Sequence, residues 1–267
     1  MIRLPSVTLP EAAQTALTNL QKVVSAKPTF AEQVAEGKRE YELARKRTEF
    51  KPILNALNSM CSGAQRCHYC EDSAATDVEH IHPKDFYPQL VFDWENYLYA
   101  CTRCNRPKSN RFDIHAHTTG ERLSVPALVK ATGTHPELGD PLLINPRLED
   151  PMELMILDLR GTFYFFPRTA KDSRDWQRAK FTIDLLLLNE VDLLPTARAE
   201  AYGSYVARLK EYVHDKAAGS PSNALVHKEA AIKRMQHPTV WREMKRQQER
   251  IPALQELFTL APEALTW

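Results

Sequence analysis

The chain has 267 residues, 43% of them hydrophobic, so it is long enough to bury a sizeable core. No run approaches the roughly 18 consecutive apolar residues of a membrane span, and the first residues lack a charged-then-apolar signal pattern. We therefore expect a soluble, cytoplasmic protein without a membrane partner. Its 35 Lys and Arg residues against 34 Asp and Glu give a formal net charge of +1, which neither indicates nor excludes a nucleic-acid partner.

Residues 1–58 are predicted to form an N-terminal helical region. Apolar residues recur at helical spacing at Leu17, Leu20 and Val24, and a similar pattern returns just before residue 58. Between these patterns, residues 36–51 carry six positive and four negative side chains. We interpret this stretch as a solvated helix face, with contact to phosphate as the alternative.

Residues 59–117 differ in kind, because they hold two C-x-x-C pairs. In a chain of this size the pairs favour zinc ligation over a disulfide framework. Each spacing lets two thiolates of one tight turn converge on a single ion, and four sulfurs complete the tetrahedral coordination of Zn²⁺ with no open position. We therefore expect a structural zinc site, with Cys61 left as a free, partly buried thiol. The four predicted ligands are Cys67, Cys70, Cys101 and Cys104.

Residues 118–267 are expected to form a C-terminal extension. Prolines and glycines predict an irregular connection to about residue 151, followed by a β-hairpin over residues 152–166 with a tight turn at Arg160-Gly161. Helical spacing returns from Arg174, with a break at the Gly-Ser-Pro triplet of residues 219–221. The segment from residue 228 to 250 carries seven positive and three negative side chains, which fits a nucleic-acid contact, a partner surface or a charged amphipathic helix.

The residues between the two cysteine pairs carry the groups that phosphodiester hydrolysis needs. This reaction requires a base that activates water, a cation that neutralises the transition state and stabilisation of the leaving oxygen. His80 can be the base, and its neighbour Glu79 can offer a carboxylate oxygen to Mg²⁺ or Mn²⁺. Asn105 can supply a second oxygen, and Asp77, which has the strand parity of Glu79, could assist the metal or orient a water.

The order of these residues resembles the HNH endonucleases, in which an acid-His pair, a central Asn and a third His or Asn beside C-x-x-C recur. Here the acid-His pair is Glu79-His80, the central residue is Asn96 and the third is Asn105. The sequence resembles more closely the HNH subunit of Septu-type and retron-associated antiphage systems. It departs from close relatives at Ile81-His82, where an aromatic residue followed by Arg is frequent. The matching segments are residues 67–71, 78–84, 94–96, 101–105 and 141–146, with Lys108, Asn110 and Phe112.

This resemblance implies a prokaryotic metal-dependent endonuclease, with DNA favoured over RNA, that is the effector of a defence complex with an ABC-type ATPase. It implies that His80 is the general base, that Glu79 and Asn105 hold the catalytic metal, and that Asn96 bridges the loop. The expected fold is α+β: a ββα-metal core, with its hairpin at about residues 77–98 and a helix from about Cys104, inside a mostly α-helical chain. A stand-alone restriction-like nuclease and a non-catalytic zinc-ribbon module that binds nucleic acid are the alternatives.

A basic run around the second cysteine pair is predicted to contact phosphate. Its four positive residues fall within nine positions and no acidic residue opposes them; Lys108 is the strongest single candidate. His82 shares the parity of His80 and could also contact phosphate, with a structural role as the alternative. The other members of the run are Arg103, Arg106 and Arg111.

Overall fold

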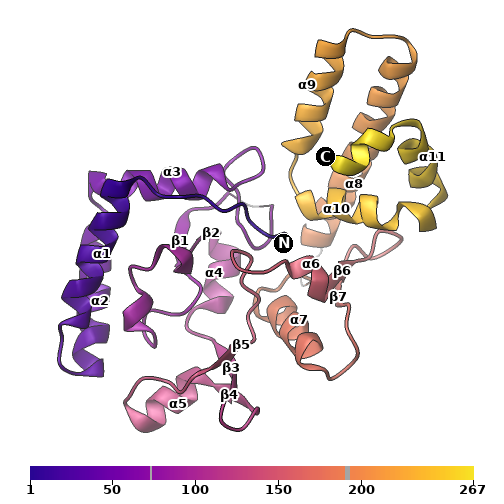
Figure 1. Ribbon diagram of the computed structural model, residues 1–267. Helices are drawn as coiled ribbons and strands as arrows, with labels where there is room; N and C mark the ends of the chain where they lie inside the picture. Colours follow the sequence, from indigo (N-terminus) through magenta and orange to yellow (C-terminus); the bar gives the residue numbers. More distant parts are fainter. Residues whose placement is uncertain (73, 190–192) are drawn as a thin grey trace.

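The computed structural model describes residues 1–72, 74–189 and 193–267. The HNH-like core lies between an N-terminal group of helices and a C-terminal group, and a small sheet closes it on a third side (Figure 1). The α+β class expected from the sequence is confirmed, because the strands are short and helices make up most of the described residues. None of the described helices is both long and apolar enough to cross a membrane.

The N-terminal helices form one wall of the molecule and are α1 (Glu11–Ser25), α2 (Phe30–Ala44) and α3 (Lys51–Ser59). Helix α1 buries Leu17 and Val24, as its spacing predicts. Helix α2 begins at a Thr29 cap, whose hydroxyl accepts a hydrogen bond from the Glu32 amide at 3.3 Å. Near its C-terminal end α2 buries Tyr41, whose hydroxyl donates to the Val78 carbonyl at 3.2 Å and so joins the wall to the core.

The core is a two-stranded hairpin followed by a short helix: β1 (Asp77–His80), β2 (Tyr97–Ala100) and α4 (Thr102–Lys108). The strands are antiparallel, with Glu79 opposite Leu98 and His80 opposite Tyr97. All of β2 is buried, which explains its aromatic and aliphatic composition. Because side chains alternate along β1, Asp77 and Glu79 share one face and His80 takes the other.

The small sheet has the order β4-β3-β5, from β3 (Asp113–Ala116), β4 (Arg122–Ser124) and β5 (Gly139–Pro141). It carries helix α5 (Val125–Thr132). Gly139 lets β5 approach β3 closely, because a Cβ there would lie 2.6 Å from the His115 carbonyl oxygen.

The predicted hairpin is present but its turn is longer than expected. Strands β6 (Met155–Leu157) and β7 (Phe165–Pro167) pair after helix α6 (Pro151–Leu154) and before α7 (Arg174–Leu185). The Asp158 carboxylate accepts hydrogen bonds from the amides of Arg160 and Thr162, at 2.9 and 2.8 Å. These bonds organise a wide loop, so the prediction of a tight turn was wrong.

The C-terminal helices are α8 (Leu193–Ala217), α9 (Ser222–Lys233), α10 (Pro238–Gln247) and α11 (Pro252–Leu260). Helices α8 and α9 project from the rest of the molecule as an arm, while α10 and α11 pack at its base (Figure 1). The predicted break between the first two is confirmed, with Gly219 at φ +73°. Short 3-10 helices complete the secondary structure: η1 (Thr48–Phe50), η2 (Pro88–Leu90), η3 (Trp94–Asn96), η4 (Gln248–Arg250) and η5 (Pro262–Thr266).

The first cysteine turn is tied to the C-terminal helices by a buried ion pair. The amino group of Met1 lies 3.0 Å from the Glu71 carboxylate and donates to the Thr239 hydroxyl at 2.6 Å. Glu71 also accepts hydrogen bonds from the amide and hydroxyl of Thr239. Three distant parts of the chain therefore meet beside Cys70.

Candidate functional site

The four cysteines of the two C-x-x-C pairs converge as the sequence predicts. Their sulfurs all lie within 4.8 Å of one another, each residue is buried, and none forms a disulfide. The His68 amide donates to the Tyr99 carbonyl at 2.9 Å, which holds the first turn against β2. Cys101 and Cys104 stand at the start of α4, and a hydrogen bond from Cys104 is the main cause of a lowered pKa at Cys101. A buried set of four thiols can hold a metal ion such as zinc.

Cys61 stays outside this cluster, as expected. It is partly exposed, and its sulfur lies 3.3 Å from Nε2 of His68. The Nδ1 atom of His68 accepts a hydrogen bond from the Tyr99 amide at 3.2 Å, so Nε2 carries the ring proton and faces the sulfur. His68 therefore has a structural role beside the cysteine cluster.

His80 is held in the orientation that a general base needs. Its Nε2 lies 2.9 Å from the Val91 carbonyl, which can only accept, so Nε2 carries the proton and Nδ1 is the free acceptor. The rings of Tyr41 and Tyr97 meet the imidazole edge-on, at centroid distances of 4.6 and 5.0 Å. Burial lowers the pKa of His80 to about 3, and the positive charge of Lys84 adds to this effect. The imidazole is therefore neutral at physiological pH.

Asn96 fixes the loop that supplies the Val91 carbonyl. Its side-chain oxygen accepts from the His82 amide at 2.7 Å, and its amide nitrogen donates to the carbonyls of His82 and Leu90, at 3.1 and 2.9 Å. These three bonds join the two ends of the loop between β1 and β2. Asn96 thus positions the acceptor of His80 and does not itself line the cleft.

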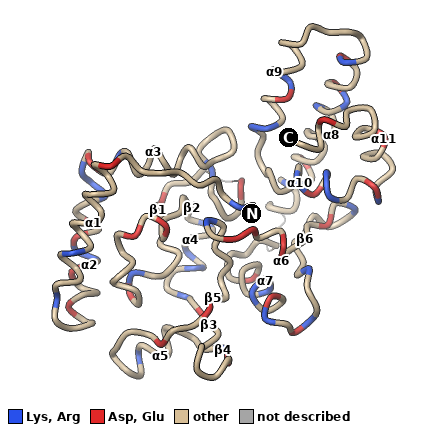
Figure 2. Tube along the Cα trace, viewed as in Figure 1, with Lys and Arg blue, Asp and Glu red and all other residues tan. Residues whose placement is uncertain are grey.

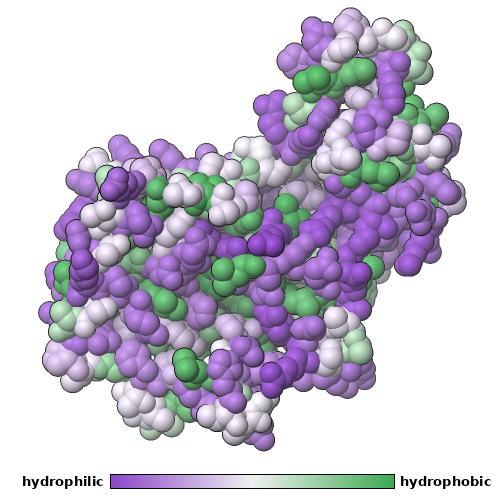
Figure 3. Space-filling view, in the orientation of Figure 1, coloured by the Kyte–Doolittle hydropathy of each residue, from purple (hydrophilic) through white to green (hydrophobic). Residues whose placement is uncertain are grey.

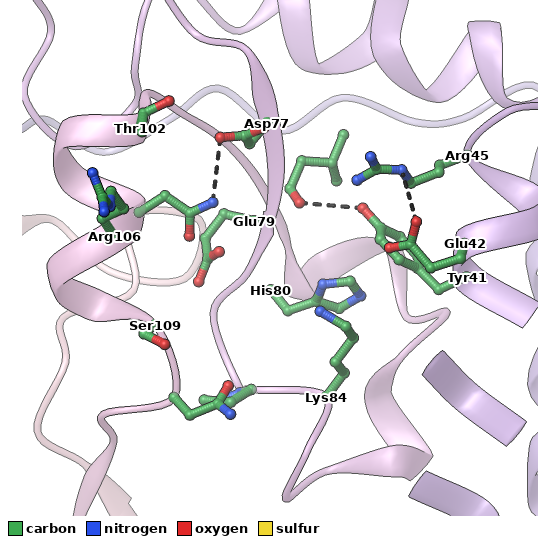
Figure 4. A pocket seen from close by; sticks show the side chains of 14 residues that line it. Tyr41, Glu42, Arg45, Asp77, Glu79, His80, Lys84, Thr102, Arg106 and Ser109 are labelled. Atoms are coloured by element: carbon green, nitrogen blue, oxygen red, sulfur yellow. Dashed lines mark hydrogen bonds and ion pairs between the residues drawn. The ribbon is translucent and has the colours of Figure 1, made fainter. Parts of the chain in front are cut away.

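Oxygen ligands gather between β1 and α4. The Asn105 amide nitrogen donates to Asp77 at 3.4 Å, and Asp77 and Glu79 extend from the same face of the strand (Figure 4). Two carboxylates and one amide oxygen are hard donors of the kind that Mg²⁺ and Mn²⁺ prefer. The residues at this position therefore fit a hard divalent cation.

Lys108 has a different environment from the one its charge suggested. It is completely buried, its ammonium pairs with Glu79, and it donates to the His80 carbonyl at 2.9 Å. Lys108 is buried because its position on α4 faces β1. The basic run in the sequence did not reveal this burial. In this structure Lys108 fixes a predicted metal ligand and is not available to solvent.

The site opens into a cleft of about 520 Å³. One wall is β1 with α4, and the other is the end of α2, where Arg45 pairs with Glu42 at 3.4 Å (Figure 4). Arg45 lies in the charged stretch that we interpreted as a solvated helix face, and its place on the cleft rim was missed. Lys84 lines the same cleft and lies 5.6 Å from the Tyr41 ring centroid. Only the packing of α2 against the core could identify this wall.

The remaining residues predicted to contact nucleic acid do not share one surface. Arg106 lines the cleft, and Arg103 is half-buried outside its lining. Arg111 is exposed and lines a neighbouring cavity, with its Nε bonded to the Pro107 carbonyl at 2.6 Å. His82 packs between Tyr87 and Phe112, at centroid distances of 5.0 and 4.9 Å, which fits the structural alternative.

Comparison with known proteins gives this geometry a family context. The family model described as HNH endonuclease matches residues 67–111. The chain is 31% identical to the Septu protein PtuB of Bacillus thuringiensis over 142 residues. This aligned segment covers 53% of this chain and 41% of the relative. It is 29% identical over 141 residues to a Septu protein PtuB of Bacillus mycoides (strain KBAB4), covering 46% of this chain and 44% of the relative. The chain thus matches less than half the length of either relative. The predicted resemblance is confirmed: residues 67–111 match the HNH endonuclease family model, and about half of the chain is similar to part of Septu protein PtuB.

Proposed function

We propose that this protein is a metal-dependent endonuclease that hydrolyses phosphodiester bonds of nucleic acid, with DNA as the favoured substrate. The observation that carries the proposal is the orientation of His80, whose protonated Nε2 is held by Val91 while its other nitrogen remains an acceptor. Beside it lie the oxygen atoms of Asp77, Glu79 and Asn105, in a cleft of about 520 Å³.

In this proposal each group in the cleft has one task. His80 takes a proton from the attacking water at Nδ1, and the Val91 carbonyl stabilises the imidazolium that forms. Glu79 and Asn105 would hold Mg²⁺ or Mn²⁺, with Asp77 as a further oxygen ligand or an orienting group for water. When bound, this cation neutralises charge on the phosphate and on the leaving oxygen. Arg106, Arg45 and Lys84 line the approach of the substrate phosphates.

The four-cysteine cluster is proposed to hold Zn²⁺ as a purely structural ion. Four sulfurs leave no coordination position for substrate, so this site takes no part in the chemistry. Its task is to lock the first cysteine turn to the start of α4 and thereby fix Asn105 relative to β1.

We propose further that the protein is a cytoplasmic effector in prokaryotic antiphage defence and acts with an ABC-type ATPase. Similarity to Septu protein PtuB supports the defence role. The helical flanks, residues 1–58 and 118–267, would then serve assembly of the complex. A stand-alone restriction-like nuclease is the alternative, and the two differ in whether the purified chain cuts nucleic acid without a partner.

The test is cleavage of double-stranded DNA, single-stranded DNA and tRNA by the purified protein with Mg²⁺ or Mn²⁺, alone and with a candidate ATPase. His80→Ala should abolish cutting. His82→Ala is the matched control, because that imidazole packs away from the cleft and its loss should leave the chemistry intact. Folded, zinc-loaded protein that cuts none of these substrates under any condition would favour the non-catalytic binding module.

A further inference from the structure

The basic segment at residues 228–250 is largely neutralised within the fold. Blue and red segments are interspersed through α8, α9 and α10 in Figure 2. Five of its seven positive side chains bind a carboxylate or the C-terminal residue: Lys228 with Glu211, Lys233 with Glu229, Arg242 with Asp150, Arg246 with Glu243, and Lys245 with the Trp267 carbonyl. The surplus charge therefore does not form one continuous basic face. Arg234 is an exception, because its only described bond is from Nε to the Ala230 carbonyl at 3.3 Å.

Arg234 joins two other arginines around a groove of about 630 Å³ on the α8–α9 arm. Arg208 comes from the exposed face of α8 and forms no ion pair within the described residues. Arg66 reaches the groove from the first cysteine turn; it donates to the Asp72 carbonyl at 2.6 Å, and its buried Nε has no hydrogen-bond partner. Three guanidinium groups from separate parts of the chain thus line one hollow. The arm stands clear of the main body in Figure 3.

The carboxylates beside the groove offset these charges only in part, because Glu211 and Asp215 share a single ammonium and together leave one negative charge against three guanidinium groups. Glu211 lines the groove, but it is bound to Lys228 at 2.6 Å, and that ammonium also lies 3.0 Å from Asp215. Like charges directed into a shared space repel one another, so the arrangement favours an anion between them. Guanidinium groups suit phosphate in particular, because their forked donors match its oxygens.

The lining of the groove indicates what kind of anion fits. Its lining includes Ser204, Ala207 and Ala231, whose small side chains leave room for a phosphate backbone to approach the helices. Among the described lining residues, Met235 is the only large apolar one, so a peptide would find little to anchor its side chains. The volume lies within the roughly 300–1,000 Å³ of ligand sites and exceeds the needs of a single phosphate group.

We propose that this arginine groove, defined by Arg66, Arg208 and Arg234, binds successive backbone phosphates of the nucleic-acid substrate outside the catalytic cleft. The inference rests on the proposed nuclease function for the nature of its ligand. The groove holds the nucleic acid through charge, without reading its sequence, while the cleft performs the cut. Substrates long enough to reach the arm therefore bind more tightly than short ones.

The test measures binding of a long labelled DNA duplex by fluorescence anisotropy over a range of salt concentrations, on the full chain carrying His80→Ala to prevent cutting. Arg208→Gln with Arg234→Gln should reduce the slope of log K against log salt by roughly 2, about one per lost phosphate contact. The control is Lys210→Gln, an exposed cation of α8 outside the groove, which should leave the slope unchanged.

The outcomes separate this inference from the proposed function. An unchanged slope, an equal loss in the Lys210→Gln control, or absence of duplex binding by the parent protein would overturn the groove proposal. So would an unchanged slope accompanied by lost binding of the ATPase, which would identify the groove as a protein-docking surface. Hydrolysis of bis(p-nitrophenyl) phosphate, a diester too small to reach the arm, reports the cleft alone. If that activity is absent while the slope falls as expected, the nuclease proposal fails and the groove stands.

Discussion

The burial of Lys108 yields a quantitative prediction about the core formed by β1, β2 and α4. Lys108→Met removes the ammonium but keeps an unbranched side chain, so it isolates the charge from the packing. Glu79 then retains a nearly buried carboxylate without its partner, and the His80 carbonyl loses a donor at 2.9 Å. Breaking a buried pair from one side typically costs about 3–5 kcal/mol, so we expect a loss of this size in the free energy of unfolding.

Two further measurements show whether the cost comes from the unpaired carboxylate. Adding Glu79→Gln to Lys108→Met should recover most of the lost stability, because the buried charge is then gone. Mg²⁺ should stabilise Lys108→Met more than it stabilises the parent protein, since a bound cation would take over the role of the ammonium.

The assay is urea unfolding followed by tryptophan fluorescence, with and without Mg²⁺. A Lys108→Met variant that unfolds within about 0.5 kcal/mol of the parent would refute the reasoning, because that is the ordinary scatter of surface substitutions. Additive effects of the two substitutions would also refute it, since residues in contact are expected to couple.

Three more outcomes follow from the site. Asn96→Ala should cost roughly 2–4 kcal/mol by leaving buried loop groups unpaired, and it should lower the cleavage rate at saturating substrate by misplacing the Val91 carbonyl. Cys104→Ser should lower the zinc content measured by mass spectrometry and shift thermal unfolding to lower temperature, because the ion loses a thiolate and the start of α4 loses its anchor. The pKa of His80 falls from 6.5 to about 3 on folding, so the unfolded chain binds a proton that the native protein excludes. Stability of the protein without a catalytic metal should therefore decline as the pH falls through 6.5, by about 1.4 kcal/mol between pH 7.5 and 5.5, and this decline should shrink in His80→Gln.

Each of these expectations has an outcome that would contradict it. Asn96→Ala with parental cleavage would show that the loop holds Val91 without the side-chain bridge. Cys61→Ser is the control for Cys104→Ser, since its sulfur lies outside the cluster, and equal zinc loss in both would contradict the four-cysteine site. A pH dependence identical in His80→Gln and the parent would mean that His80 is not buried in its neutral form.

The sequence by itself determined the parts of the site that depend on local spacing. Two C-x-x-C pairs predict converging sulfurs, because two residues between cysteines place both thiolates on one turn. The resemblance to HNH endonucleases implied the places of the acid-His pair, Asn96 and Asn105 around the hairpin and helix. Strand parity also placed Asp77 and Glu79 on one face, as the structure shows.

Tertiary structure alone decided which charges face solvent. Lys108 belongs to a basic run, yet its position on α4 turns it into the core, while Arg106 in the same run reaches the cleft. Arg45 reaches the cleft from α2. Arg66 and Arg234 line the same groove although they lie far apart in the sequence. A run of charged residues in the sequence shows how many charges a segment carries. The packing of distant helices determines which of these side chains form ion pairs. The candidate catalytic residues are therefore encoded locally, whereas the surfaces proposed to receive a substrate arise from long-range packing.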